Sequence, residues 1–281
     1  MGGLMGDGLL DGRCVIVTGA GRGLGRAYAL ACAAHGAAVV VNDVDEAAAH
    51  AVATEIAAAG GHAVAEPGSA GSWEVAARLA GTAELEFGRL DGLVANAGIT
   101  HHGPPWEEDE ARLRRITEVN VLGVQFAAVH AMRAMVRRGA GGSIVTVVSG
   151  ARFGIPGMSA YGATKGAVAA MTAGWARDCA SAGIRINAVS PLAETGMAAL
   201  DTRPDRPALG SPGDVAPVVV ALLSDAARGV TGRIVRFDGA DLGVYAPETL
   251  IPVTGWTAGD PAASIAKALA RLGDSATAGP S

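Results

Sequence analysis

The stretch Cys14-Val15-Ile16-Val17-Thr18-Gly19-Ala20-Gly21-Arg22-Gly23-Leu24-Gly25 decides how this chain folds. Its opening apolar run is short and rich in β-branched side chains, which is typical of a strand buried on both faces. The glycines after the run predict a tight turn, and residues 23–35 are predicted to form a helix. The sequence therefore begins with a strand, a glycine-rich turn and a helix.

The same alternation continues to about residue 240. Apolar runs predict further strands over residues 39–41, 63–65, 92–95, 143–148, 184–189 and 234–237, separated by helices over 45–59, 72–87, 107–138, 159–182 and 213–224. Such strands, joined by helices, form right-handed crossovers. We therefore expect one α/β domain over residues 1–245, a Rossmann-like, doubly wound parallel sheet of seven strands with helices on both faces. Prolines and glycines follow, so residues 246–281 are expected to form an irregular arm, a short helix and a flexible tail.

Composition excludes several classes of protein. Half of the 281 residues are hydrophobic and 17% are charged, which excludes a disordered chain. No apolar run reaches the roughly 18 residues that span a bilayer, and the N-terminus lacks the features of a secretory signal. A net charge of −5 gives no reason to expect nucleic acid or an anionic membrane as a partner. Because the three cysteines are scattered, we expect neither a metal site nor disulfides. We expect the protein to be cytoplasmic.

The glycine-rich turn has the features of a phosphate-binding loop. Backbone N–H groups that open a helix can approach a pyrophosphate, and the positive end of the helix favours it. Asp43 ends the second predicted strand about 20 residues further on, where dinucleotide-binding folds place the carboxylate that binds ribose hydroxyls. Asp43 would repel a 2′-phosphate and so favours NAD over NADP, although Arg22 could pair with that phosphate. The alternative is a structural turn followed by an ordinary helix N-terminus.

Tyr161 and Lys165 lie four residues apart in a predicted helix, and therefore on one face of it. A nearby ammonium lowers the pKa of a phenol, and such a tyrosine can exchange a proton with an alcohol or carbonyl oxygen while a hydride moves at carbon. Ser149 could orient the same oxygen. Taken alone, a Tyr–Lys pair of this spacing is by default a solvated surface pair, so the neighbouring motifs carry the argument.

Together, these motifs resemble those of the short-chain dehydrogenase/reductase family. The resemblance runs from Leu10 to about Gly239 and rests on Thr18-Gly19-xxx-Gly23-x-Gly25, Asn96-Ala97-Gly98, Asn120, Ser149, Tyr161-xxx-Lys165 and Asn187-xxx-Pro191. It implies that Tyr161 is the general acid/base and that Ser149 holds the substrate oxygen. It also implies that Lys165 binds the nicotinamide ribose and lowers the pKa of the tyrosine, and that Asn120 supports a water linking Lys165 to solvent.

The resemblance further implies a cofactor site at the carboxyl ends of the strands. Its residues would be Gly19, Gly21, Arg22, Gly23, Leu24, Gly25, Asp43, Ser69, Ala70, Asn96, Ala97, Gly98, Tyr161, Lys165, Pro191, Leu192 and Thr195. Within the family, residues 26–30, 39–43 and 230–236 resemble the branch with the D-3-hydroxyacyl-CoA dehydrogenase domain of multifunctional enzymes. That likeness adds an acyl thioester to the candidate substrates.

The sequence departs from the family pattern in three places. The segment from Ser149 to Tyr161 is one residue short, Ser69 replaces an aspartate that contacts adenine, and Leu192 replaces a glycine, with Thr195 one residue early. Residues 192–212 are too few for a two-helix substrate lid, and their prolines predict a loop. His101 and His102 are expected to be solvated loop side chains rather than metal ligands.

Two functional hypotheses follow. The first is an NAD-dependent oxidoreductase that interconverts a small-molecule secondary alcohol and a ketone, possessing the complete set of catalytic groups. The alternative is a catalytically weak, dinucleotide-binding regulatory or scaffold protein, which the residues at 69 and 192 favour. The helices over 107–138 and 159–182 are long and apolar on more than one face, and the resemblance implies that they pair subunits into a homodimer or homotetramer.

Overall fold

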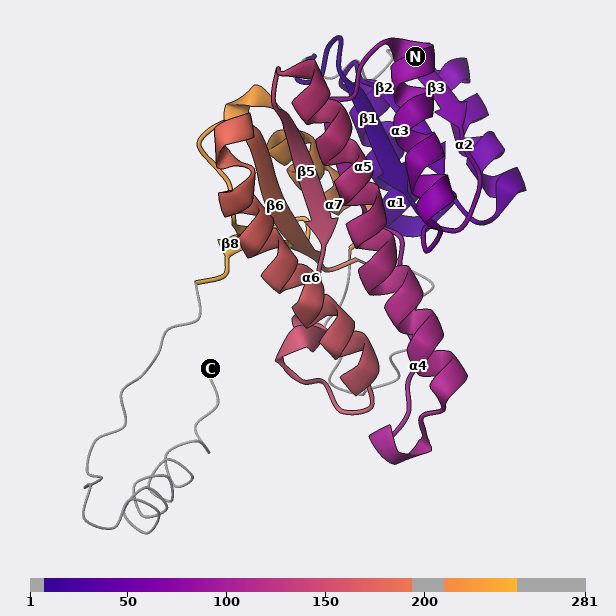
Figure 1. Ribbon diagram of the computed structural model, residues 1–281, viewed down its shortest axis with the longest axis vertical. Coiled ribbons are helices and arrows are strands. Elements are labelled where there is room, and N and C mark those ends of the chain that lie inside the picture. The colour runs from indigo at the N-terminus through magenta and orange to yellow at the C-terminus, as the bar shows by residue number, and fades with distance from the viewer. Residues whose placement is uncertain (1–7, 194–209, 247–281) are drawn as a thin grey trace, which may run out of the picture. The chain divides into compact units, whose positions relative to one another are not determined.

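The computed structural model describes residues 8–193 and 210–246 (Figure 1). Within them, eight strands form one sheet in the order β3-β2-β1-β4-β5-β6-β7-β8. The strands are β1 (Cys14–Thr18), β2 (Ala38–Asn42), β3 (His62–Ala65), β4 (Gly92–Ala95), β5 (Gly142–Val147), β6 (Ile184–Pro191), β7 (Ile234–Phe237) and β8 (Leu242–Val244). The first seven are parallel, and the strand order reverses between β1 and β4. The predicted doubly wound α/β fold is confirmed, with its ligand-binding crevice expected at this reversal.

The predicted count of seven strands is wrong, because β8 adds an antiparallel edge strand beside β7. The chain reverses at Asp238, whose Oδ1 accepts hydrogen bonds from the N–H groups of Ala240 (3.0 Å) and Asp241 (2.7 Å). Leu242 then pairs with Phe237. An exposed strand of three residues carries no hydrophobic periodicity, so the sequence pattern could not reveal it.

Helices cover both faces of the sheet, as predicted. They are α1 (Gly23–Ala34), α2 (Glu46–Ala58), α3 (Trp73–Phe87), α4 (Glu110–Thr117), α5 (Gly123–Arg138), α6 (Ser159–Asp178) and α7 (Pro212–Leu223). In Figure 1, α3, α5 and α6 lie in front of the sheet, and α1 and α7 lie behind it. Side chains alternate along β1, so that Val15 and Val17 pack with α1, α2 and α7, whereas Cys14 and Ile16 pack with α3, α5 and α6. The core therefore has two layers.

The single helix predicted over residues 107–138 is wrong in its start and its continuity. Asp109 caps the helix by accepting a hydrogen bond from the N–H of Arg112 (2.8 Å), so α4 begins at Glu110. A π-helical turn, Glu118–Leu122, then separates α4 from α5. By length and composition alone, Glu110–Arg138 could cross a membrane, but 44% of its most apolar window is buried inside the fold.

Two predicted features fall outside the described part of the chain. The arm, helix and tail expected over 246–281 lie there apart from Ala246, and so does most of the loop expected over 192–212. At the borders of that loop, Ala193 and Gly210 form a parallel bridge, and Ser211 and Asp214 form a capping box that begins α7.

Candidate active site

The glycine-rich turn joins β1 to the N-terminus of α1. Gly23 has a φ of +55°, a conformation that favours glycine. A Cβ atom on Gly25 would overlap the carbonyl oxygen of Gly19, so only glycine allows the helix to start this close to the turn. Leu24, between them, packs against the core. Because the backbone lies open at the positive end of α1, the turn is suited to hold a phosphate.

Asp43 lies beside this turn, directly after β2, and only 6% of it is exposed. Its Oδ2 accepts a hydrogen bond from the N–H of Gly21 (2.8 Å), and its Oδ1 accepts one from the N–H of Asp45 (3.0 Å). A Cβ atom on Gly21 would lie 2.9 Å from the carboxylate, so glycine is required for this approach. Arg22 is exposed at the N-cap of α1. The carboxylate is therefore fixed, whereas the guanidinium is at the surface.

The loop that carries Ser69 and Ala70 is held next to Asp43. The side chain of Asn42 donates hydrogen bonds to the carbonyl oxygens of Glu66 (2.9 Å) and Gly68 (3.1 Å), and the N–H of Gly68 donates to the carbonyl oxygen of Asp43 (2.9 Å). The hydroxyl of Ser69 accepts from the N–H of Gly71 (3.2 Å). The hydroxyl that stands in place of the expected aspartate is thus partly engaged in its own turn.

The Asn96-Ala97-Gly98 segment is clamped to the glycine-rich turn. The side chain of Asn96 donates to the carbonyl oxygens of Thr18 (3.0 Å) and Gly19 (3.1 Å). In return, the hydroxyl of Thr18 accepts hydrogen bonds from the N–H groups of Asn96 and Ala97, both at 3.1 Å. Sequence reasoning missed this role of Thr18, because a threonine at the end of a strand has no distinctive signal. The clamp fixes the spacing between the carboxyl ends of β1 and β4.

Tyr161 and Lys165 lie in the first turns of α6, and both are almost fully buried. Ser149 follows β5 and caps the short 3₁₀ helix Gly150–Phe153 by accepting from the N–H of Ala151 (3.2 Å). The Ser149 hydroxyl lies near enough to the Tyr161 phenol to lower its pKa, so the shortened segment between them still brings the two side chains together. The Lys165 ammonium donates to the carbonyl oxygen of Val147 (2.7 Å) and lies 5.6 Å from the centre of the Tyr161 ring.

Burial dominates the ionisation of this pair. It raises the pKa of Tyr161 from 10.0 to about 12, against the smaller opposing effect of the Ser149 hydroxyl. It lowers the pKa of Lys165 from 10.5 to about 8. Both shifts favour the uncharged forms, because each charge loses hydration in the interior. The lowering of the tyrosine pKa by Lys165 that the resemblance implies is therefore wrong for this arrangement, because burial raises that pKa and only the Ser149 hydroxyl opposes the rise.

Asn120 lies fully buried in the π-helical turn and connects three elements. Its Oδ1 accepts from the N–H of Ile99 (2.8 Å), and its Nδ2 donates to the carbonyl oxygen of Ile99 (2.9 Å) and to the hydroxyl of Thr164 (3.0 Å). A Cβ atom on Gly98 would lie 3.4 Å from Oδ1 of Asn120 and 3.6 Å from the ammonium of Lys165. The segment after β4 thus meets α6 at Asn120, and sequence reasoning missed Thr164 as its partner.

The predicted nicotinamide side of the site is described only in part. Pro191 ends β6, and the N–H of Leu192 donates to the carbonyl oxygen of Phe237 (3.0 Å). Both residues are half-buried at the carboxyl edge of the sheet. Thr195 lies outside the described residues.

The expectation that His101 is a solvated loop side chain is wrong. Its Nε2 lies 2.7 Å from both carboxylate oxygens of Glu108, and the two side chains are 22% and 10% exposed. The loop folds back because the N–H of Gly103 donates to the carbonyl oxygen of Gly157 (2.9 Å). Sequence spacing alone could not show that Glu108 would face the histidine. His102 is exposed, as expected.

Comparison with known proteins decides the family. The sequence model of the short chain dehydrogenase family matches residues 13–204 of this chain. The chain belongs to the short-chain dehydrogenase family. Cis-4-hydroxycyclohexanecarboxylate dehydrogenase of Sinomonas cyclohexanicum is 39% identical over 239 residues, covering 81% of this chain and 95% of the relative.

Solved structures agree with this assignment. A short chain dehydrogenase from Mycobacterium avium matches with a TM-score of 0.82 at 34% identity, covering 93% of this chain and 96% of the other. A 7α-hydroxysteroid dehydrogenase in complex with NADH and 7-oxo glycochenodeoxycholic acid matches with a TM-score of 0.76 at 33% identity, covering 83% and 96%. The chain is therefore an oxidoreductase that acts on CH–OH groups of small alcohols or on the matching ketones, and it depends on a dinucleotide.

Proposed function

We propose that this short-chain dehydrogenase uses NAD to interconvert a secondary alcohol and a ketone, with Tyr161 as the general acid/base. The observation that carries the proposal is the buried cluster at the carboxyl edge of the sheet. There the Ser149 hydroxyl lies near the Tyr161 phenol and affects its pKa, and Lys165 lies on the same helix face as Tyr161. The segment Asn96–Gly98 connects this cluster to the glycine-rich turn, since Asn96 binds Gly19 and Gly98 approaches Lys165.

Each side chain has a role that its position supports. A bound nicotinamide supplies or accepts the hydride. Tyr161 takes the proton of the alcohol during oxidation and returns it to the carbonyl oxygen during reduction. Ser149, whose hydroxyl lies near the phenol, holds the same substrate oxygen. Lys165 binds the nicotinamide ribose, and Asn120 holds Ile99 and Thr164 in register around it.

Asp43 supports NAD rather than NADP as the dinucleotide. Its carboxylate is fixed by two backbone N–H groups beside the glycine-rich turn, where it can accept hydrogen bonds from ribose hydroxyls. A 2′-phosphate in that place would face a buried negative charge. The remaining dinucleotide contacts are assigned to the turn Gly19–Gly25, to Ser69 and Ala70, to Asn96–Gly98 and to Pro191–Thr195.

The substrate is proposed to be largely apolar. Ile99, Ile155 and Met158 are partly buried and pack against the small apolar cluster that contains Tyr161. One relative is a cis-4-hydroxycyclohexanecarboxylate dehydrogenase, and one similar structure is a hydroxysteroid dehydrogenase in complex with 7-oxo glycochenodeoxycholic acid. An alicyclic secondary alcohol therefore leads the candidates, followed by the hydroxyacyl thioester suggested by the likeness to the hydroxyacyl-CoA dehydrogenase branch.

We also infer a cytoplasmic homodimer or homotetramer that pairs through α5 and α6. On α5, Val136 is 57% exposed, and Val129, Met132 and Val136 line a hollow of about 420 Å³ between Arg133 and Arg137. Apolar side chains in this position are suited to a self-complementary interface. Light scattering in solution tests this inference, and a monomer at all concentrations would contradict it.

The experiment that tests the proposed function follows NADH absorbance with purified protein and a panel of substrates. The panel holds cyclohexanol derivatives, hydroxysteroids, a 3-hydroxyacyl-CoA and the matching ketones, each with NAD or NADP. We expect turnover of at least one alicyclic alcohol, with NAD preferred. Tight dinucleotide binding without turnover of any substrate would instead favour the regulatory or scaffold protein.

A further inference from the structure

A cavity of about 630 Å³ lies at the opposite edge of the sheet from the candidate active site. Arg13 lies directly before β1, Asp91 directly before β4, and Arg185 near the start of β6. All parallel strands start at the same edge of a sheet, whereas Ser149 and Tyr161 follow the carboxyl end of β5. The cavity is therefore separate from the dinucleotide site.

The charged side chains around this cavity have an excess of positive charge. The five basic residues that line it are Arg13, Arg89, Arg138, Arg185 and Arg228. The acidic residues that line it are Asp11, Asp91 and Asp225. Two positive charges thus remain without a matching carboxylate, in a chain whose net charge is −5.

One aspartate is already fully engaged. The carboxylate of Asp91 is 5% exposed and accepts hydrogen bonds from Arg89 (2.7 and 2.9 Å) and from the N–H of Cys14 (2.9 Å). It also forms an ion pair with Arg138 at 2.6 Å. The Nε of Arg138 is buried and has no hydrogen-bond partner in the described part of the chain. Two guanidinium groups therefore share one carboxylate.

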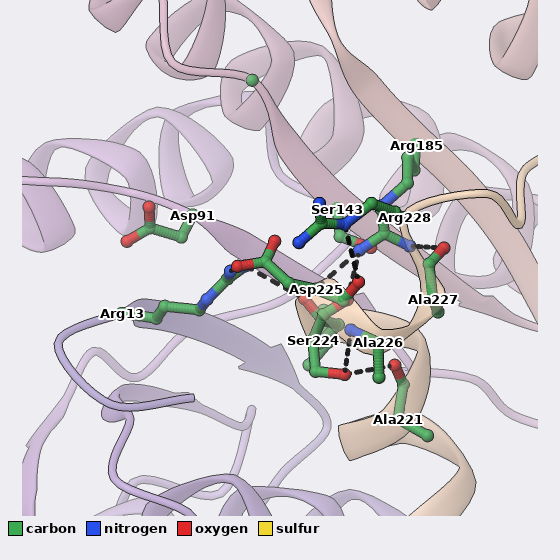
Figure 2. Close-up of polar contacts among 12 residues, drawn as sticks. Arg13, Asp91, Ser143, Arg185, Ala221, Ser224, Asp225, Ala226, Ala227 and Arg228 are labelled. Atoms are coloured by element: carbon green, nitrogen blue, oxygen red, sulfur yellow. Dashed lines mark hydrogen bonds and ion pairs between the residues drawn. The ribbon is translucent and has the colours of Figure 1, made fainter. Parts of the chain in front are cut away.

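The second aspartate, Asp225, lies in a turn after α7 that three arginines approach (Figure 2). Arg13 forms an ion pair with its Oδ2 at 2.7 Å, and the Nε of Arg228 donates to its carbonyl oxygen at 3.3 Å. Arg185 donates to the carbonyl oxygens of Leu222 (2.8 Å), Ser224 (2.9 Å) and Ala227 (3.1 Å), among others. Neither Arg185 nor Arg228 forms an ion pair within the described residues.

Arg185 shows the electrostatic consequence. The guanidinium is half-buried and, among the residues that the structure describes, hydrogen-bonds only carbonyl oxygens. Burial and the like charge of Arg13 lower its pKa, with Asp225 acting in the opposite direction. A guanidinium that has lost hydration without gaining a carboxylate is stabilised by any anion that enters the cavity.

We propose that this cavity binds a small multivalent phosphate compound, held by hydrogen bonds from Arg13 and Arg228, while Arg185, whose terminal N–H groups are donated to carbonyl oxygens, adds positive charge. Planar guanidinium groups bind phosphate oxygens through paired hydrogen bonds, and arginine is the residue best suited to this geometry. The volume lies within the range of about 300–1,000 Å³ that small-molecule sites occupy. The alternative is that the arginines only tie the C-terminal end of α7 to the strands.

Calorimetric titration with inorganic pyrophosphate tests the proposal, using protein saturated with NAD so that the glycine-rich turn is occupied. Arg228→Gln removes a guanidinium whose one hydrogen bond within residues 8–193 and 210–246 is to a carbonyl oxygen, so the fold should be retained. Arg115→Gln, on α4 and outside the cavity, is the matched control. We expect wild type and control to bind pyrophosphate equally, and Arg228→Gln to bind it about tenfold more weakly.

Citrate provides the second arm of the test, because it carries multiple negative charges without phosphate. Binding of citrate as tight as that of pyrophosphate would overturn the assignment to phosphate. Equal pyrophosphate affinity in all three proteins, or no binding to wild type, would overturn the site itself. The test compares the pyrophosphate affinities of three variants of one protein, so its outcome does not depend on which dinucleotide occupies the glycine-rich turn. It also does not depend on whether the protein turns over an alcohol.

Discussion

Replacing Lys165 by methionine tests the electrostatics of the candidate active site through folding stability. Methionine has a similar length and no charge, so the substitution removes the ammonium without opening a large cavity. The structure places this ammonium in the interior, 3% exposed, with one hydrogen bond to the carbonyl oxygen of Val147. The charge of Lys165 therefore lowers the free energy of unfolding of wild type, and Lys165→Met lacks this destabilisation.

The size of that destabilisation follows from the pKa. A fall from 10.5 to about 8 corresponds to about 3 kcal/mol against the charged form. Below pH 8 the lysine is charged in both states, so the full cost applies. Between pH 8 and 10.5 the unfolded chain holds the proton and the folded chain does not, so the stability of wild type rises with pH. Between pH 7 and 9.5 we expect wild type to gain about 2 kcal/mol relative to Lys165→Met.

The assay is urea unfolding of both proteins, freed of dinucleotide, over that pH range. The difference between the two proteins cancels the titration of other groups, such as the thiols of Cys14 and Cys32, whose pKa values burial raises to about 12. After allowance of about 1 kcal/mol for the lost hydrogen bond to Val147, Lys165→Met should be the more stable protein at pH 7. A difference that stays constant with pH would refute the reasoning, because it would mean that Lys165 keeps its ordinary pKa.

Three further substitutions probe the other parts of the site. Asp43→Ser should raise the NADP-to-NAD ratio of kcat/KM by about tenfold or more, since it removes the charge that faces a 2′-phosphate; an unchanged ratio would contradict the placement of the ribose. Gly25→Ala should prevent folding because its Cβ atom would overlap the carbonyl oxygen of Gly19, whereas the control Gly81→Ala, in open space on α3, should raise the free energy of unfolding by about 0.5–1 kcal/mol. Asn120→Ala should lower the free energy of unfolding by about 2 kcal/mol and lower kcat more than it raises KM, because both polar groups of Ile99 lose their partner; a change in KM alone would assign Asn120 to substrate binding instead.

Much of the fold could be predicted from the sequence because its signals are local. The buried strand Cys14–Thr18 is a continuous apolar run, and Gly19 and Gly25 after it are required by close backbone contacts. Seven parallel strands and their covering helices follow from repeated use of the same pattern. The edge strand β8 could not be predicted, because its three exposed residues are placed by an aspartate turn rather than by hydrophobic burial.

The sequence could predict which residues form the candidate site, but not their ionisation or the contacts that position them. Motif spacing brought Tyr161, Lys165 and Ser149 to one place, but their pKa values depend on burial, which spacing does not reveal. The π-helical turn at Asn120 and the pairing of His101 with Glu108 arise from contacts between separate segments. Side chains that meet across a fold leave no periodic signal in the sequence.

The most direct measurement of the central claim compares wild type with Tyr161→Phe on a substrate that wild type turns over. The phenol that would exchange the proton is removed, while its ring and the surrounding packing remain. We expect kcat to fall by about 100- to 10,000-fold, with the dissociation constant of NAD unchanged when measured by protein fluorescence. Turnover retained at the wild-type rate, with unchanged NAD binding, would contradict the assignment of Tyr161 as the general acid/base.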